Sequence, residues 1–255
     1  MKITIDQEQG LLLVQTAQGT ESIPLYSDRA FEIISREWVR IGWNQKYTYT
    51  FTWLGRPIIQ MPEDVLRIQE VIFKVNPSVI VECGVAHGGS ISLYASLLKL
   101  LGQGRVIGVD VEIRPHNWAA LDAHMLRDRM ELIEGDSSSK ETLARVKQHL
   151  KPDDRVLVIL DSNHSKAHVA KELELYAPLV SLDSYIVVTD GIMRDLHDLP
   201  NGKRAWHDDA PLDAIEAFIK TTDKFQIEQP AWAFNESTLS RNITYWPNSY
   251  LRRVR

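Results

Sequence analysis

Five acidic residues share one feature of the sequence: each lies at or just past the end of a short apolar run. They are Glu82, Asp110, Asp136, Asp161 and Asp190. Such runs read as strands of a parallel sheet, and in open parallel sheets a ligand binds beyond the carboxyl ends of the strands. A lone aspartate there is most often a turn former or a helix cap. Five acids at one edge are hard to attribute to capping alone, so we expect them to line a ligand site.

The first of these runs, residues 79–81, leads into a glycine-rich turn. The chain continues as Glu82-Cys83-Gly84-Val85-Ala86-His87-Gly88-Gly89-Ser90, followed by an apolar-periodic segment. A strand, a tight turn and a helix start form a nucleotide-binding corner, because glycines let a ligand approach the backbone and the helix start offers free N–H groups. An acid before the first glycine resembles the S-adenosylmethionine corner of class I methyltransferases. The alternative is a turn that only packs a helix on a strand.

Two acids further along the chain fit an adenosine ligand. Asp110 follows the corner at the distance at which an acid on the second strand binds ribose hydroxyls, and Asp136 lies where an adenine edge would be. The absence of a second early glycine favours S-adenosylmethionine over a dinucleotide. The predicted cofactor-binding residues are Glu82, Gly84, Ala86, His87, Gly88, Ser90, Asp110, Asp136 and Ser137. For His87, a surface histidine in a turn is an equally good explanation.

From residue 61 onward the pattern alternates between helix and strand. Apolar residues at helical spacing fall in 62–75, 91–101, 118–126, 140–150 and 169–180, and β-branched runs fall in 79–81, 105–110, 130–133, 155–160 and 185–188. Alternating units of this length predict a parallel sheet with helices on both faces. The expected fold class is therefore α/β, with a Rossmann-like doubly wound sheet as the methyltransferase domain over residues 61–255.

Residues 1–60 are expected to form an N-terminal arm. Residues 2–26 read as short β structure, a helix is expected at about 29–42, and residues 47–53 alternate aromatic residues with threonine. Such a β segment is too thin to be stable alone. We expect the arm to pack on the main domain or on a partner subunit, and therefore expect a homo-oligomer. Nothing in the arm points to chemistry.

Composition excludes several classes of protein. The chain has 29 basic and 34 acidic residues and a formal net charge of −5, which argues against nucleic-acid binding. Cys83 is the only cysteine, so a disulfide-stapled secreted domain is excluded. No stretch has the length and apolarity of a signal peptide or of a membrane span. A cytoplasmic protein without an integral membrane segment is expected.

Four motifs resemble the cephalosporin hydroxylase / rhamnosyl O-methyltransferase family, over residues from about 45 to 253. They are the run from Thr48 to Gly55, the glycine corner, Leu160-Asp161-Ser162-Asn163-His164-Ser165, and the run from His168 to Leu173. Members of this family look like class I methyltransferases, and several methylate sugar hydroxyls with a divalent metal, usually magnesium. The resemblance implies that Asp161 and Asp190 are metal ligands and that His164 is the base. The family usually has an acid at the position of Thr189, which here offers at most a neutral oxygen.

These residue types suit methyl transfer to an alcohol. Displacement from a sulfonium is in-line, so an enzyme mainly positions the two reactants. The alcohol becomes a good nucleophile when a metal lowers its pKa and an imidazole accepts its proton. Two aspartates and a hydroxyl form an oxygen site that suits magnesium. The alternative for His164 is a helix-start residue that bonds only to backbone.

Three functions remain open on the sequence. The first is a magnesium-assisted O-methyltransferase whose partner is a small-molecule or saccharide acceptor, such as a glycosylated natural product or a polysaccharide. The second is an oxidoreductase or hydroxylase of antibiotic biosynthesis, but an iron site of that kind needs two histidines and no second histidine pairs with His164. The third is a non-catalytic protein that binds S-adenosylmethionine. The presence of Asp161, His164 and Asp190 together argues against the third.

Overall fold

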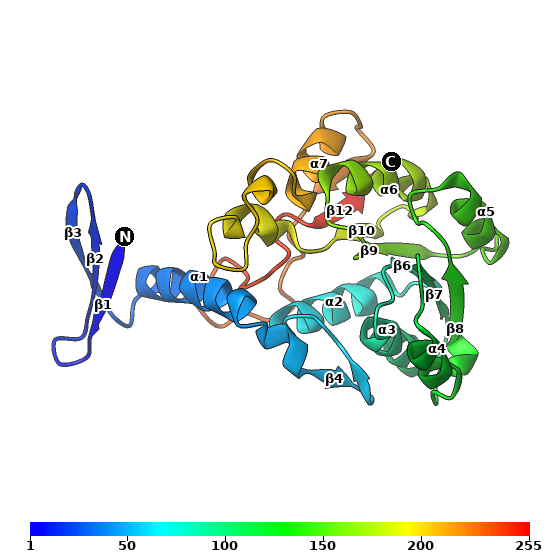
Figure 1. Ribbon diagram of the computed structural model, residues 1–255, viewed down its shortest axis with the longest axis horizontal. Helices are drawn as coiled ribbons and strands as arrows, with labels where there is room; N and C mark the ends of the chain where they lie inside the picture. Colours follow the sequence, from blue (N-terminus) through cyan, green and yellow to red (C-terminus); the bar gives the residue numbers. More distant parts are fainter.

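The computed structural model describes residues 1–255 and is built around one seven-stranded sheet (Figure 1). The strand order is β11-β12-β10-β9-β6-β7-β8. Their bounds are β6 Val79–Cys83, β7 Arg105–Asp110, β8 Met130–Glu134, β9 Val156–Leu160, β10 Tyr185–Val188, β11 Phe225–Ile227 and β12 Tyr250–Arg253. The strands β6 to β10 run parallel, and β12 pairs antiparallel with both of its neighbours. The five predicted parallel strands are thereby confirmed.

Helices cover both faces of this sheet. The helices α2 (Pro62–Val75), α3 (Gly89–Leu100) and α4 (Pro115–Asp122) lie on one face, and α5 (Lys140–Gln148), α6 (Lys166–Tyr176) and α7 (Pro211–Ile219) lie on the other. Alternate residues of one strand enter different cores: Ile80 packs with α2 and α3, whereas Val79 and Val81 pack with α5 and α6. This two-sided burial explains the unbroken β-branched runs and confirms the doubly wound α/β fold. No helix is both long enough and apolar enough to cross a bilayer.

The N-terminal residues form a three-stranded antiparallel sheet that stands away from the body of the molecule (Figure 1). It comprises β1 (Lys2–Asp6), β2 (Leu11–Thr16) and β3 (Gly19–Pro24), and it leads into α1 (Asp28–Asn44). The helix begins at Ser27, whose hydroxyl accepts a hydrogen bond from the Ala30 amide. The buried core of this arm is small, and consists of Leu12, Val14, Ile23 and Ala30.

Residues 45–60 lead from the arm into the main domain. They form the short helix η1 (Tyr47–Thr50) and a two-stranded ladder of β4 (Thr52–Trp53) and β5 (Arg56–Pro57), and they pack against α3. A Cβ on Gly89, the first residue of α3, would lie 2.2 Å from the Pro57 carbonyl oxygen. Only glycine allows the two backbones to approach this closely.

The polar connection after β10 is folded rather than extended. It contains η4 (Gly191–Leu196) and η5 (Arg204–His207). One guanidinium nitrogen of Arg40, on α1, contacts both carboxylate oxygens of Asp198, at 2.9 and 3.0 Å. The connection is thus attached to the first long helix, and the arm is joined to the edge of the sheet where the acids lie.

Candidate active site

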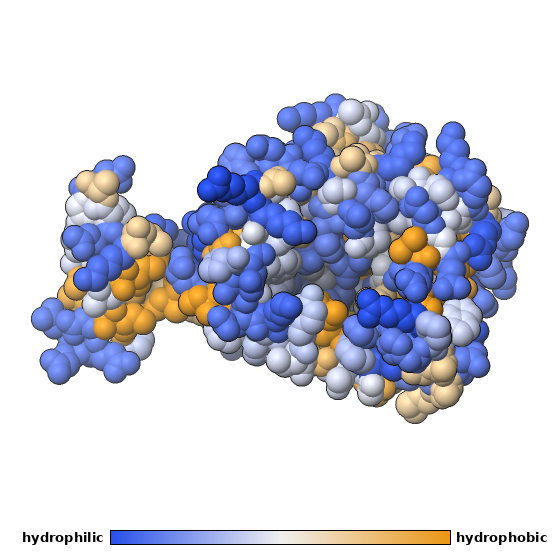
Figure 2. Space-filling model, in the orientation of Figure 1, coloured by the Kyte–Doolittle hydropathy of each residue, from blue (hydrophilic) through white to orange (hydrophobic).

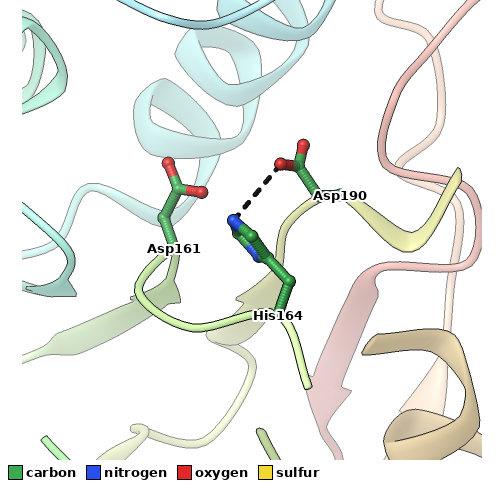
Figure 3. A group of neighbouring side chains, drawn as sticks. All are labelled: Asp161, His164 and Asp190. Carbon is green, nitrogen blue, oxygen red and sulfur yellow. Dashed lines mark ion pairs between the residues drawn. The ribbon is translucent and has the colours of Figure 1, made fainter. Parts of the chain in front are cut away.

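Three side chains converge where two neighbouring strands end (Figure 3). Asp161 follows β9, Asp190 follows β10, and His164 lies in the turn between β9 and α6. The Nε2 atom of His164 is 3.4 Å from Oδ2 of Asp190, and one ligand atom of each residue lies within 4.8 Å of the others. Because β9 and β10 pair in parallel, their carboxyl ends bring the two aspartates to one place.

The two carboxyl groups are held in an unfavourable electrostatic setting. Burial raises the pKa of Asp161, and the nearby charge of Asp190 raises it further. Burial also raises the pKa of Asp190, while His164 acts in the opposite direction. Two half-buried carboxylates with a single imidazole beside them favour a bound cation, which would lower both pKa values. The carboxylate oxygens therefore fit a divalent metal ion such as magnesium, with the His164 imidazole beside them.

Thr189, which precedes Asp190 in the chain, is fully buried beside Asp161. Its hydroxyl donates to Oδ1 of Asp161 and lies 3.1 Å from the carbonyl oxygen of Leu160. This contact orients the Asp161 carboxylate without adding negative charge to the site. The expectation that Thr189 offers at most a neutral oxygen to a metal stays a prediction.

The turn that presents Asp190 is strained and tightly packed. Asp190 has a left-handed backbone with φ of 57°, which is costly for a residue with a side chain. A Cβ on the next residue, Gly191, would lie 2.9 Å from the Pro247 carbonyl oxygen. The Ile192 amide donates to the Tyr245 carbonyl oxygen at 3.1 Å. The surrounding chain therefore imposes the conformation of this turn.

Asp64, in the first turn of α2, holds that surrounding chain in place. It is buried and accepts hydrogen bonds from the Thr244 hydroxyl and, at 2.9 Å, from the Tyr245 amide. Burial raises the pKa of Asp64 to about 7, although both hydrogen bonds act to lower it. Asp64 thus fixes the segment on which the Asp190 turn rests, and the sequence pattern gave no sign of this role.

Replacing Asp64 by asparagine is expected to remove a pH dependence of stability. An aspartate in the unfolded chain has a pKa of about 3.9, which is below its pKa in the folded protein. The free energy of unfolding of wild type therefore falls as the pH rises between these two pKa values. The asparagine side chain of D64N keeps an acceptor for the Tyr245 amide but cannot ionise. The stability of D64N relative to wild type should therefore grow by roughly 2–4 kcal/mol over that window. Urea unfolding at several pH values measures it, with E63Q as the control; parallel pH curves for D64N and wild type would contradict this role.

The glycine corner is shaped by an acid of the next strand. Oδ2 of Asp110 accepts from the amides of Val85, at 2.8 Å, and Ala86, at 2.9 Å. Ala86 has a left-handed φ of 46°, so these bonds hold an unfavourable backbone conformation. The structure therefore places Asp110 at the corner, as expected, and commits one of its oxygens to the corner's own backbone.

Two residues that the sequence pattern did not single out support the corner from outside. The Arg56 guanidinium donates to the His87 carbonyl oxygen at 2.9 Å and to Oδ1 of Asn117 at 2.8 Å. The Asn117 amide in turn donates to the Ala86 carbonyl oxygen at 2.9 Å. Arg56 lies in β5 and Asn117 in α4, so the corner is held by elements far apart in the sequence. The His87 side chain itself makes no hydrogen bond.

The first glycine of the corner is required by packing. Gly84 has φ of +106°, and a Cβ there would lie 2.0 Å from the Asp161 carbonyl oxygen. The corner therefore rests directly on the start of the loop that carries Asp161 and His164. The close approach makes one continuous site of the glycine corner and the loop that carries Asp161 and His164.

Glu82 is fully buried at the end of β6, and neither of its carboxylate oxygens has a hydrogen-bond partner in the protein. Burial and the charges of Asp161 and Asp110 raise its pKa well above the usual range, while the neighbouring Ser90 hydroxyl acts in the opposite direction. A buried carboxyl without a partner is costly, so it fits a ligand that brings a donor or a positive charge. The ammonium group of S-adenosylmethionine is such a donor.

The two residues predicted to meet an adenine differ in their surroundings. Asp136 is exposed and accepts from the amide and the hydroxyl of Ser138, at 2.8 and 2.7 Å, which is a turn-forming role. Ser137 is buried, and its hydroxyl lies 3.1 Å from Nε2 of His168. Ser90 is buried at the start of α3, and Gly88 precedes it with φ of +81°.

Comparison with known proteins agrees with this geometry. The family model described as Rhamnosyl O-methyltransferase/CmcI matches residues 45–254. The chain belongs to this family. It is 31% identical over 205 residues to the rhamnosyl O-methyltransferase of Mycobacterium tuberculosis, covering 79% of this chain and 78% of the relative. The corresponding protein of Mycobacterium leprae is 30% identical over 173 residues, with 66% and 70% covered.

Solved structures share the fold. CmcI in its apo form aligns with a TM-score of 0.55 at 19% identity, covering 81% of this chain and 77% of CmcI. MycE, a methyltransferase of mycinamycin biosynthesis in complex with Mg and SAH, aligns with a TM-score of 0.52 at 17% identity. That alignment covers 93% of this chain and 66% of MycE. The resemblance read from the sequence motifs is thereby confirmed at the level of family and fold.

Proposed function

We propose that this family member transfers a methyl group from S-adenosylmethionine to a hydroxyl of a saccharide or of a glycosylated natural product. The observation that carries the proposal is the junction at Gly84, where the cofactor-type corner rests on the loop of Asp161 and His164. The site therefore has a place for an adenosine ligand beside a cation site with a base. The names of the relatives and the Mg and SAH bound to MycE support the same reaction.

In this proposal Asp161 and Asp190 would hold a magnesium ion, with the Thr189 hydroxyl as a neutral neighbour. A bound divalent ion supplies Lewis acidity, which lowers the pKa of an acceptor hydroxyl. His164 accepts the acceptor's proton at Nε2, the nitrogen that faces Asp190. Glu82 binds the ammonium group of the cofactor, and Asp110 orients the ribose through Oδ1, which also accepts from the Glu112 amide at 3.2 Å. The chain's contribution is to align the hydroxyl oxygen with the methyl carbon.

The test is methyl transfer from isotopically labelled S-adenosylmethionine to a panel of rhamnosyl and other 6-deoxyhexosyl glycosides. Label in an O-methyl product is the expected result. Binding of S-adenosylhomocysteine without transfer to any glycoside would favour a non-catalytic binding protein. Failure to bind the cofactor would remove the proposed function altogether.

A cytoplasmic location is part of the proposal, because the cofactor is made there.

The Asp110→Ala variant should bind S-adenosylhomocysteine more weakly. It loses a charge-assisted bond to the ribose, which is worth roughly 1.5–3 kcal/mol, and it frees the amides of Val85 and Ala86. Calorimetry measures the affinity. Glu112→Ala is the matched control, because it removes an exposed acid two residues further along the chain. Equal affinities of D110A and wild type would reject Asp110 as a cofactor residue.

We also propose that the chain forms a homo-oligomer through its N-terminal arm. One face of α1 exposes a stripe of large apolar side chains, with exposed fractions of 42% for Phe31, 45% for Trp38 and 58% for Ile41. Figure 2 shows apolar surface on the arm and where it meets α1. The arm buries only a small core of its own, so a second copy would cover surface that is otherwise in water.

Light scattering at micromolar concentration is expected to give a multiple of the chain mass. Replacing Trp38 and Ile41 by glutamate should lower that mass to one chain, because charges would be buried in the contact. Leu66→Glu, a change of an exposed apolar residue on α2, is the control and should leave the mass unchanged. A monomeric wild type would end this proposal while leaving the enzymatic one intact.

A further inference from the structure

A second polar cluster lies at the same edge of the sheet and is separate from the group of Asp161, His164 and Asp190. This His168 cluster consists of Ser137, Ser162, His168 and Glu172. Nε2 of His168 is 3.1 Å from the Ser137 oxygen, 3.2 Å from the Ser162 oxygen and 3.4 Å from Oε1 of Glu172. The Ser162 hydroxyl donates to the same Oε1 at 2.7 Å.

The cluster bridges two strand ends that are not neighbours. Ser137 follows β8 and Ser162 follows β9, and β6 and β7 lie between these strands in the sheet. The loop after β8 leads into α5, and α5 packs beside α6, so Ser137 and His168 meet on the face of the sheet that these helices cover. Glu172 is close enough to Cys83, the last residue of β6, that burial and its charge together raise the pKa of the thiol. Since Gly84 follows Cys83, the His168 cluster adjoins the cofactor corner.

The protons in this cluster can be assigned from the chemistry of its members. Glu172 is fully buried, and its contact with His168 raises the pKa of the imidazole. A carboxylate beside Nε2 favours the form that carries a proton on that nitrogen. The single Nε2–H then donates to the Ser137 oxygen, the nearest of the three at 3.1 Å, and the Ser162 proton is used on Glu172. The Ser137 proton has no acceptor in the protein, because its only side-chain contact is with His168.

We propose that His168, held by Glu172, is a positioning residue that turns the Ser137 hydroxyl into a hydrogen-bond donor for a ring nitrogen of the cofactor's adenine. The inference rests on the proposed function, since it takes S-adenosylmethionine as the ligand. All ring nitrogens of adenine other than the glycosidic one are acceptors, so a serine that presents only a proton is complementary to that base. Without a proton on Nε2, the Ser137 hydroxyl would donate to His168 instead and present no proton to the ligand.

The test is calorimetric binding of S-adenosylhomocysteine to wild type, S137A, H168A, H168Q and the S137A/H168A double variant. S137A and H168A should each weaken binding by roughly 3- to 10-fold, the value of one hydrogen bond. The double variant should be no weaker than S137A, because His168 acts on the ligand only through the Ser137 hydroxyl. H168Q should bind like wild type, since its side-chain amide can donate from the position of Nε2. Lys140→Ala, which changes an exposed side chain three residues after Ser137, is the control with unchanged affinity.

The outcomes distinguish the positioning role of His168 from the proposed function. Wild-type affinity in H168A, or losses that add in the double variant, would overturn the positioning role and leave the proposed function standing. No binding by wild type would overturn both. If H168A does not fold, deaza analogues of S-adenosylhomocysteine with one ring nitrogen replaced by CH give the answer. One analogue should bind wild type more weakly than the parent and S137A equally well; no such analogue would reject the inference.

Discussion

The His164→Ala variant is expected to lower methyl-transfer turnover by about 10²–10⁴-fold, the usual range for loss of a general base. In the wild-type chain, the Nε2 atom of His164 lies 3.4 Å from Oδ2 of Asp190, among the atoms that would surround an acceptor hydroxyl. The affinity for S-adenosylhomocysteine should not change, because the cofactor corner is formed by other residues. A loss of turnover without a loss of cofactor binding is the signature of a base rather than of a folding residue.

Single-turnover rates with saturating cofactor and acceptor measure the effect. His116→Ala is the matched control, since it removes an exposed histidine on α4 that lies outside the site. Wild-type turnover in H164A would remove the imidazole from the mechanism.

Activity is also expected to vanish in excess chelator and to return when magnesium is added. A divalent ion contributes several kcal/mol to the stabilisation of a developing alkoxide, so its removal should cost about 10²-fold or more in rate. Asp161→Asn and Asp190→Asn keep the shape of the ligands but remove charge, and both should weaken metal binding. Asp208→Asn, a change of an exposed acid after η5, is the control. Full activity in chelator would leave the site with positioning and base roles only.

Metal affinity should fall as the pH falls. Burial raises the pKa values of Asp161 and Asp190, so protons compete with the metal at higher pH than they would at ordinary carboxylates. Thr189→Asp adds a carboxylate beside Asp161 and should tighten metal binding. Aspartate is closer in volume to threonine than glutamate is, which matters because Thr189 is fully buried. Magnesium titration at several pH values measures both effects, and affinity that is independent of pH would contradict the role of the two acids.

The sequence by itself determined the sheet and the position of the acids along it. Strands such as Val79–Cys83 are buried on both faces, which requires apolar side chains at nearly every position and leaves a readable run. The polar residues that end each run must then lie at one edge of a parallel sheet. The sequence pattern therefore predicted Asp161 and Asp190 at this edge, and the resemblance of the surrounding motifs to a known family implied their role as metal ligands and that of His164 as the base.

Only the tertiary structure decided what holds these residues in place. Arg56 and Asn117 support the glycine corner, Asp64 supports the Asp190 turn, and His168 joins two strand ends. Each of these contacts joins segments 31 or more residues apart, and each pairs an ordinary polar side chain with a backbone group or another side chain, with no local pattern. The periodicity of a sequence reports which face of an element is buried. It does not report which polar group on another element will meet it, because that depends on how the packed helices bring distant turns into contact.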